Sequence, residues 1–143
     1  MNRFVSLPNE PLIGANEVVV EVPHDMVAAL ALEFSLLLSN LATALRLGAK
    51  HGASILISVG HGTSVSKATV RRQRLDTISF ELGRNQAEYL LAALLHAYRD
   101  GVAEVNHLHI EGIEGSGLFD LTVMFERYRE PMSGSDATKL MNE

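Results

Sequence analysis

The longest apolar pattern in the chain covers residues 25–47, DMVAALALEFSLLLSNLATALRL, and contains neither glycine nor proline. Its apolar residues recur at the spacing of three and four positions that places side chains on one face of a helix. We therefore expect one long helix over residues 25–47. Leu32, Leu36 and Leu47 fall on the opposite side, so the pattern also predicts neighbours on two sides of this helix.

A second helical pattern covers residues 86–100, QAEYLLAALLHAYRD. Asn85 precedes it and Glu88 follows three residues later, which is the spacing of a capping box at a helix N-terminus. Gly101 follows the last apolar turn, as is common at helix C-termini. The pattern therefore predicts a second helix that ends at Gly101.

Strands are predicted where β-branched and aromatic residues alternate with polar ones between turn residues. The segments with this pattern are residues 17–22, 54–60, 75–82, 106–112 and 118–126. Residues 1–16 lack it and are expected to form an irregular arm. The polar residues 61–74 are expected to form a hairpin connection or a loop, in which Lys67, Arg71, Arg72 and Arg74 form a basic cluster.

The order of these elements is β-α-β-β-α-β with one added strand, which is the ferredoxin-like order. We therefore expect an α+β two-layer sandwich, in which a mostly antiparallel sheet has two helices on one face and leaves the other face open. Residues 1–130 would form a single domain, and the polar residues 131–143 a flexible tail.

Strand alternation separates the side chains of the sheet into two sets. The set expected to face the helices is large and apolar: Val18, Val20, Val22, Ile55, Ile57, Val59, Ile78, Phe80, Leu82, Leu108, Ile110, Phe119, Leu121, Val123 and Phe125. The set expected on the open face is polar and rich in carboxylates, and it includes Glu17, Glu21, Thr122 and Met124.

Composition narrows the function classes. The 143 residues are 47% hydrophobic and 20% charged, as in a globular domain, and the absence of cysteine excludes disulfides and thiolate sites. The formal net charge of −5 argues against a nucleic-acid binder. Pro8 and Pro11 interrupt the N-terminus, which is unlike a secretory signal, and polar residues in segment 25–47 disfavour a membrane span. We therefore expect a cytoplasmic protein.

The sequence places His107, His109 and Glu111 at alternate positions of one predicted strand, so their side chains point the same way. Two imidazoles and a carboxylate could bind zinc, which leaves a small metal-dependent hydrolase as one alternative. The spacing along a strand is too wide for all three to share an ion comfortably, so a solvated polar face is favoured. No catalytic constellation or cofactor is expected.

The segments TISFELGRNQAEYLLAALLHAYRDG, VNHLHIEG and GSGLFDLTVMF, within residues 76–126, resemble small immunity proteins of bacterial polymorphic-toxin systems. The resemblance implies a non-enzymatic protein that binds and neutralises a cognate toxin. An acidic open face would suit a basic toxin domain. The residues expected to contact it are His107, His109, Glu111, Asp120, Met124 and Glu126. A self-associating domain that dimerises through the 25–47 helix is the other alternative.

Overall fold

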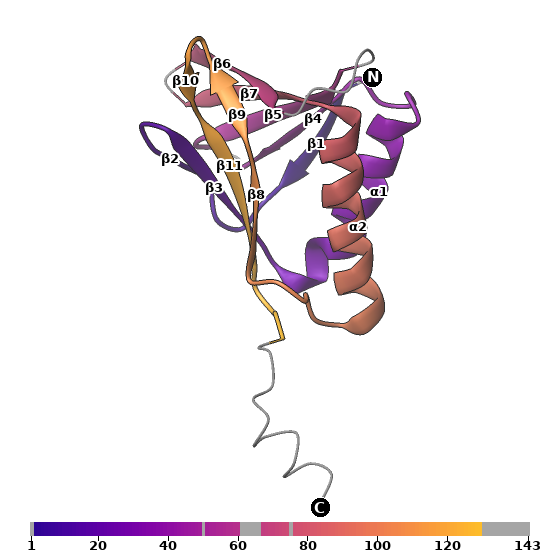
Figure 1. Cartoon of the computed structure of the whole chain (residues 1–143). Coiled ribbons are helices and arrows are strands. Elements are labelled where there is room, and N and C mark those ends of the chain that lie inside the picture. The colour runs from indigo at the N-terminus through magenta and orange to yellow at the C-terminus, as the bar shows by residue number, and fades with distance from the viewer. Residues whose placement is uncertain (1, 50, 61–66, 75, 130–143) are drawn as a thin grey trace, which may run out of the picture.

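The computed structural model describes residues 2–49, 51–60, 67–74 and 76–129, which form an α+β fold (Figure 1). Its helices are α1 (Val27–Leu38), which follows the 3₁₀ turn η1 (His24–Met26), and α2 (Arg84–Asp100). Its strands are β1 (Asn2–Ser6), β2 (Leu12–Ile13), β3 (Glu17–Val22), β4 (Ala44–Gly48), β5 (Ser54–Val59), β6 (Ala68–Arg74), β7 (Thr77–Leu82), β8 (His107–Ile110), β9 (Gly112–Glu114), β10 (Gly117–Leu118) and β11 (Asp120–Phe125).

The described strands form two mixed sheets. Sheet A has seven strands in the order β1-β4-β5-β7-β6-β9-β10, and sheet B has four in the order β2-β3-β11-β8. Parallel pairs join β1 to β4, β5 to β7 and β6 to β9 in sheet A, and β3 to β11 in sheet B. The single, mostly antiparallel ferredoxin-like sheet that we expected is not the arrangement in the structure, because the five expected strands are divided between two sheets.

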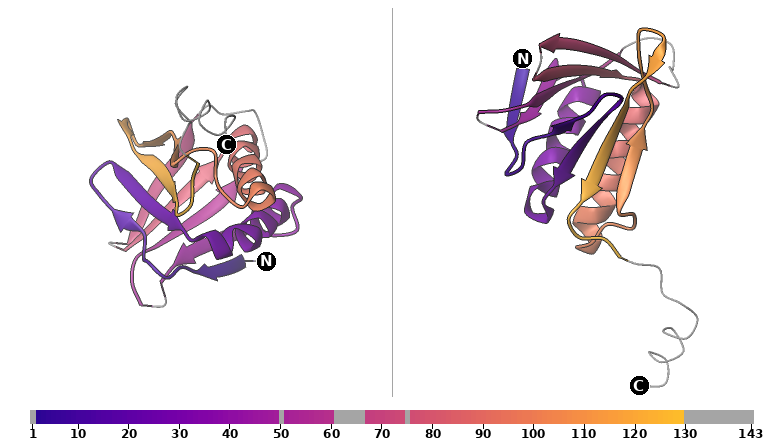
Figure 2. Two further views of the ribbon diagram at one scale, coloured as in Figure 1. Left: turned by 90° about the horizontal axis from the view of Figure 1, so that it is seen from below. Right: turned by 90° about the vertical axis from the view of Figure 1, so that its left-hand side faces the viewer.

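The two sheets share the hairpin of residues 107–125, which passes from one sheet to the other (Figure 2). β8 and β11 belong to sheet B, whereas β9 and β10 continue the same hairpin into sheet A. Glu111 and Phe119 lie at the two crossing points, where the Phe119 N–H donates to the Gly112 carbonyl at 2.9 Å. The chain bends here because the hairpin must pair with β6 at one end and with β3 at the other.

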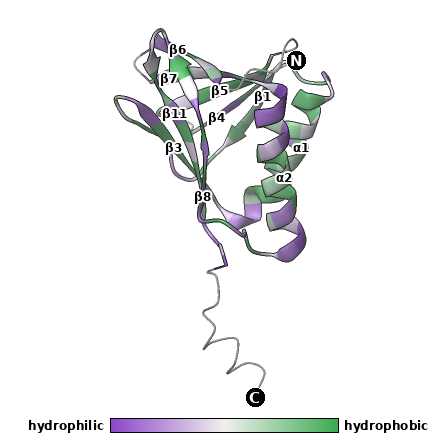
Figure 3. Ribbon diagram, viewed as in Figure 1, coloured by the Kyte–Doolittle hydropathy of each residue, from purple (hydrophilic) through white to green (hydrophobic). Residues whose placement is uncertain are grey.

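The core lies between the sheets and the helices. Every residue of the set expected to face the helices is buried, from Val18 in sheet B to Phe80 in sheet A, but Thr122, which was expected on the open face, is buried as well. α1 and α2 lie side by side, and α1 also packs against β4 and β5 (Figures 1 and 2). Figure 3 shows that α1 is more hydrophobic than α2, and it contributes Leu30, Phe34 and Leu37 to the core.

The predicted helix over residues 25–47 is too long. α1 ends at Leu38, Asn40 has a φ of 60°, and Ala44–Gly48 form strand β4. β4 pairs with β1 on one side and with β5 on the other, so tertiary pairing overrides the helix propensity of this segment. Leu47 is consequently buried at 3% exposure, and the expected Leu32–Leu36–Leu47 dimer surface does not exist as one helix side.

The ends of α2 agree only partly with the prediction. Gly101 terminates the helix with a φ of 76°, as predicted. The helix begins earlier than predicted, because Gly83 rather than Asn85 is the N-cap residue. Its backbone N–H donates to Oε1 of Gln86 at 3.0 Å.

The chain segments that we expected to be irregular contain strands. β1 and β2 lie within residues 1–16, and β6 forms the second half of residues 61–74, the segment expected to be a hairpin connection or a loop. β6 pairs with β7 in an antiparallel hairpin, whereas β5 and β7, the strands that this segment was expected to connect as a hairpin, lie parallel to each other. Residues 61–66 and the expected tail over 131–143 lie outside the described residues. Neither α1 nor α2 is long and apolar enough to span a membrane.

Candidate protein-binding surface

The outer side of sheet B carries the residues predicted to contact a partner. The strand register places Asp120 beside Glu17, and Met124 between Glu21 and His107. The four strands of sheet B contain no lysine or arginine. We call this surface the acidic face and define it by Leu12, Glu17, Val19, Glu21, His107, His109, Glu111, Asp120, Thr122, Met124 and Glu126.

The six predicted contact residues follow the length of this face. Asp120 and Glu111 lie toward its end at the crossing to sheet A, and Glu126 lies just beyond the other end of β11. His107, His109, Glu111 and Glu126 are exposed, whereas Asp120 and Met124 are half-buried. Six residues of strand at about 3.3 Å each separate the two ends by about 20 Å. The six residues therefore form an elongated surface rather than a compact site.

Thr122 links the histidines to the acidic strand β3. Its hydroxyl lies 2.9 Å from Oε2 of Glu17 and 2.9 Å from Nδ1 of His109, and Thr122 is 4% exposed. The rings of His107 and His109 meet edge to face, with their centroids 4.7 Å apart. These contacts fix the orientation of His109 on the acidic face.

A metal site at His107, His109 and Glu111 is not assembled in the structure. His109 directs Nδ1 to Thr122, and Glu111 lies past the end of β8. Among the described residues, only His96, Asp100 and Glu104 have ligand atoms that all lie within 4.8 Å of one another.

The cluster of His96, Asp100 and Glu104 lies at the exposed end of α2, and an arginine side chain contacts two of its members. Arg99 contacts Nδ1 of His96 at 3.0 Å and pairs with Asp100 at 2.8 Å. The hydrogen bond from Arg99 lowers the pKa of Asp100, and the positive charge of the guanidinium adds to this effect. A cation is therefore already supplied by the chain, which disfavours a metal ion there.

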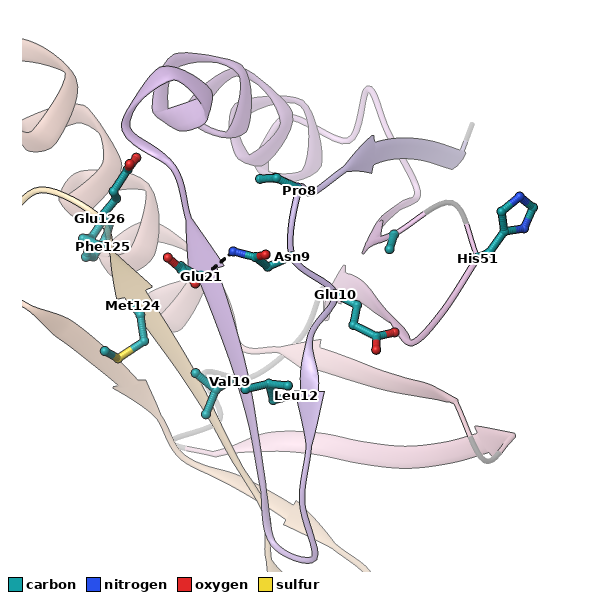
Figure 4. Close-up of a pocket in the computed structure, with 11 residues that line it drawn as sticks. Pro8, Asn9, Glu10, Leu12, Val19, Glu21, His51, Met124, Phe125 and Glu126 are labelled. Carbon is teal, nitrogen blue, oxygen red and sulfur yellow. Dashed lines mark hydrogen bonds between the residues drawn. The ribbon is translucent and has the colours of Figure 1, made fainter.

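A groove with a volume of about 880 Å³ crosses one end of the acidic face (Figure 4). Val19 and Met124 lie within it, Leu12 borders it, and the N-terminal segment around Asn9 forms its far wall. β2 pairs with β3 only at residues 18 and 19, because Pro11 lacks the N–H needed to continue the ladder. The segment before β2 therefore separates from β3, and the gap becomes the groove.

Three carboxylates at the groove each accept a hydrogen bond through one of their two oxygens. Oε2 of Glu21 accepts from the Asn9 side chain at 3.2 Å, and Oε2 of Glu126 accepts from the His24 N–H at 2.8 Å. Oε2 of Glu10 accepts from the Ala53 N–H at 2.8 Å. The sequence predictions included Glu126 and Met124 but missed the wall at Asn9 and Glu10, because no periodic pattern placed residues 1–16 beside sheet B.

Charge is divided between the two sheets. Sheet A carries its arginines on β1, β4 and β6: Arg3, Arg46, Arg71, Arg72 and Arg74. The acidic side chains in its strands are Glu81 and Glu114. Sheet B contains only acidic charges in its strands, apart from its histidines.

No protein-family model, curated protein or solved structure matches this chain.

Proposed function

We propose that this protein is a non-enzymatic binding protein that neutralises a cognate, basic toxin domain through its acidic face. The observation that carries the proposal is an open sheet surface with five acidic side chains in its strands or directly next to them, Glu17, Glu21, Glu111, Asp120 and Glu126, and no lysine or arginine in those strands. The resemblance of residues 76–126 to immunity proteins points to the same class of function.

The chemistry of the acidic face suits rapid recognition of a cationic protein. Carboxylates spread over about 20 Å would steer a basic domain toward the surface and raise its association rate. Leu12, Val19 and Met124 provide apolar area between these charges, and Leu12 is 67% exposed. Tight interfaces usually contain such apolar anchors within a polar rim.

Capture from the native host, followed by association kinetics, tests this proposal. The wild-type chain should capture a basic protein in a stoichiometric complex. The triple variant E111K/D120K/E126K should associate with that protein at least about tenfold more slowly at low salt, with a weaker dependence on salt. The matched variant E81K/E88K/E104K has the same net charge, but its changes lie on sheet A, on α2 and just beyond α2. It should associate as the wild type does.

Two outcomes would contradict the proposal. An unchanged association rate in E111K/D120K/E126K would show that the acidic face does not steer the partner. A captured partner of acidic character would show that the charge argument has the wrong sign.

A further inference from the structure

The groove on the acidic face is shaped for an extended chain segment. It lies where the β2-facing edge of β3 continues past its pairing with β2, from Val20 to Val22. On its other side, β3 pairs with β11 along its whole length. The backbone of the opposite wall is held away from β3 by contacts of its own, since the Leu7 N–H donates to the Gly48 carbonyl at 2.9 Å, and the Asn9 side chain reaches across to Glu21. The groove is therefore a fixed feature between two supported walls.

The charges in the groove are oriented before any ligand arrives. Among the described residues, the hydrogen bonds to Glu21 and Glu126 each reach Oε2 of the carboxylate, which leaves Oε1 of each as an acceptor. Figure 4 shows Glu21 facing Asn9, with Glu126 beyond the end of β11. A carboxylate that is already oriented loses less side-chain entropy when a cationic donor binds it.

The spacing of the carboxylates favours a chain over a single ion. Glu21 is paired in register with Met124, and Glu126 lies two residues further along the same direction. Glu21 and Glu126 are therefore offset by about 6.6 Å along the strands, the spacing of alternate side chains in an extended chain, and by one strand spacing across the sheet, which the long side chain of arginine can span. Glu10, Glu21 and Glu126 do not form a group with ligand atoms within 4.8 Å of one another among the described residues, as one metal ion would need.

The floor of the groove suits the stem of a long cationic side chain. Val19 and Met124 are half-buried there, and the thioether of Met124 adapts to neighbouring groups. Arginine and lysine pack their methylene stems on apolar surface while the charged end reaches a carboxylate. Arginine is favoured because its guanidinium is less strongly hydrated and can donate two parallel hydrogen bonds.

We propose that this groove binds an extended segment of the partner that carries arginines at alternate positions, with one guanidinium at Glu21 and the next at Glu126. This assignment of the occupant rests on the proposed function, because the partner is expected to be basic. It adds a defined anchoring site to the broader steering role of the acidic face.

The test uses the peptide acetyl-Arg-Val-Arg-Val-Arg-amide as the probe and NMR titration of the whole chain as the measurement. The matched control peptide replaces each arginine by citrulline, which keeps the shape and removes the charge. The arginine peptide should shift the amide signals of residues 19–21 and 124–126 with a dissociation constant of about 1 mM or below. E21Q/E126Q should weaken binding at least about fivefold, whereas E81Q on sheet A should leave it unchanged.

Three results would overturn the inference: shifts confined to other surfaces, equal binding of the citrulline peptide, or unchanged binding by E21Q/E126Q. The E21Q/E126Q variant should keep the amide spectrum of the folded wild type, which separates lost binding from lost folding. Failure here is distinguishable from failure of the proposed function. If the captured partner still associates slowly with E111K/D120K/E126K but normally with E21Q/E126Q, the acidic face binds the partner without this groove.

Discussion

The hydroxyl of Thr122 determines which nitrogen of His109 carries a proton. A carboxylate only accepts hydrogen bonds, so the Thr122 hydroxyl donates its single proton to Glu17. The contact with His109 must then be a donation from Nδ1–H to the Thr122 oxygen. Neutral His109 is thus held as the Nδ1–H tautomer, and its Nε2 is an acceptor on the acidic face.

The variant Thr122→Val should change this tautomer. Valine has nearly the same shape but no hydroxyl, so His109 loses the acceptor that favours Nδ1–H and should shift toward the Nε2–H tautomer. Nitrogen NMR of the imidazole ring measures the two forms directly. The free energy of unfolding should fall by about 1 kcal/mol, the usual contribution of one hydrogen bond. An unchanged ring spectrum would show that Thr122 does not set the tautomer.

Arg3 and Glu33 form the ion pair that attaches strand β1 to helix α1. Nε and one terminal nitrogen of Arg3 each contact a different oxygen of Glu33 at 2.9 Å, and Glu33 is only 7% exposed. The hydrogen bonds and the negative charge of Glu33 raise the pKa of Arg3. Removal of the arginine would leave a buried carboxylate without its partner.

Arg3→Ala should therefore lower the free energy of unfolding more than Arg84→Ala does. Arg84 pairs with Glu88 across one turn of α2, and both of these side chains are more than half exposed. Exposed pairs of this kind contribute little to stability. Urea unfolding of the two variants gives the comparison, and equal losses would contradict the structural role of the Arg3–Glu33 pair.

At the scale of elements, the crossing of the 107–125 hairpin between the sheets depends on Gly112. A Cβ atom at this position would clash with the Phe119 carbonyl oxygen and would lie 2.6 Å from Cγ2 of Val70. The Phe119 backbone cannot move aside without disturbing its hydrogen bond to the Gly112 carbonyl. Glycine is therefore required where the strand changes sheets.

Gly112→Ala should lower the free energy of unfolding by about 1–3 kcal/mol, the usual cost of overpacking. Gly117→Ala is the matched control in the same hairpin, because its Cβ would make only an ordinary contact, 3.7 Å from the Glu114 carbonyl oxygen. Urea unfolding measures both variants. Equal midpoints would mean that the crossing tolerates a side chain.

The elements also show which parts of the fold the sequence could predict. Strand alternation identified the buried apolar residues of β3, β5, β7, β8 and β11, because a side chain on a strand has only two possible faces, but it wrongly placed the buried Thr122 on the open face. The end of α1 was not predictable in the same way. Residues 44–48 have a helical composition, and their strand conformation depends on pairing with β5 and with β1, which is distant in sequence and lies in a segment without a strand pattern.

The candidate surface was predictable to a similar degree. Alternation placed His107, His109 and Met124 on one outer face, and the structure brings Met124 into register with His107. The groove could not be predicted, because its wall depends on where the segment after β1 packs. That position is set by contacts of Leu7 with Gly48 and of Glu10 with Ala53, neither of which follows from a periodic pattern.

At the scale of the whole molecule, the division of charge gives the protein two different outer surfaces. Acidic side chains gather on sheet B, and the arginines of sheet A lie mainly on β6. A basic partner would therefore be attracted to one side and repelled from the other, which favours a single binding orientation. The net charge of −5 adds a general attraction but no orientation.

Carboxylate footprinting of the complex with the captured partner tests the central claim most directly. Mass spectrometry measures how fast each carboxylate reacts with a carbodiimide and an amine, in the free protein and in the complex. Glu21, Asp120 and Glu126 should react more slowly in the complex, whereas Glu81 on β7 and Glu88 on α2 should react as they do in the free protein. Slower reaction at Glu81 or Glu88, with the acidic face unchanged, would contradict the account.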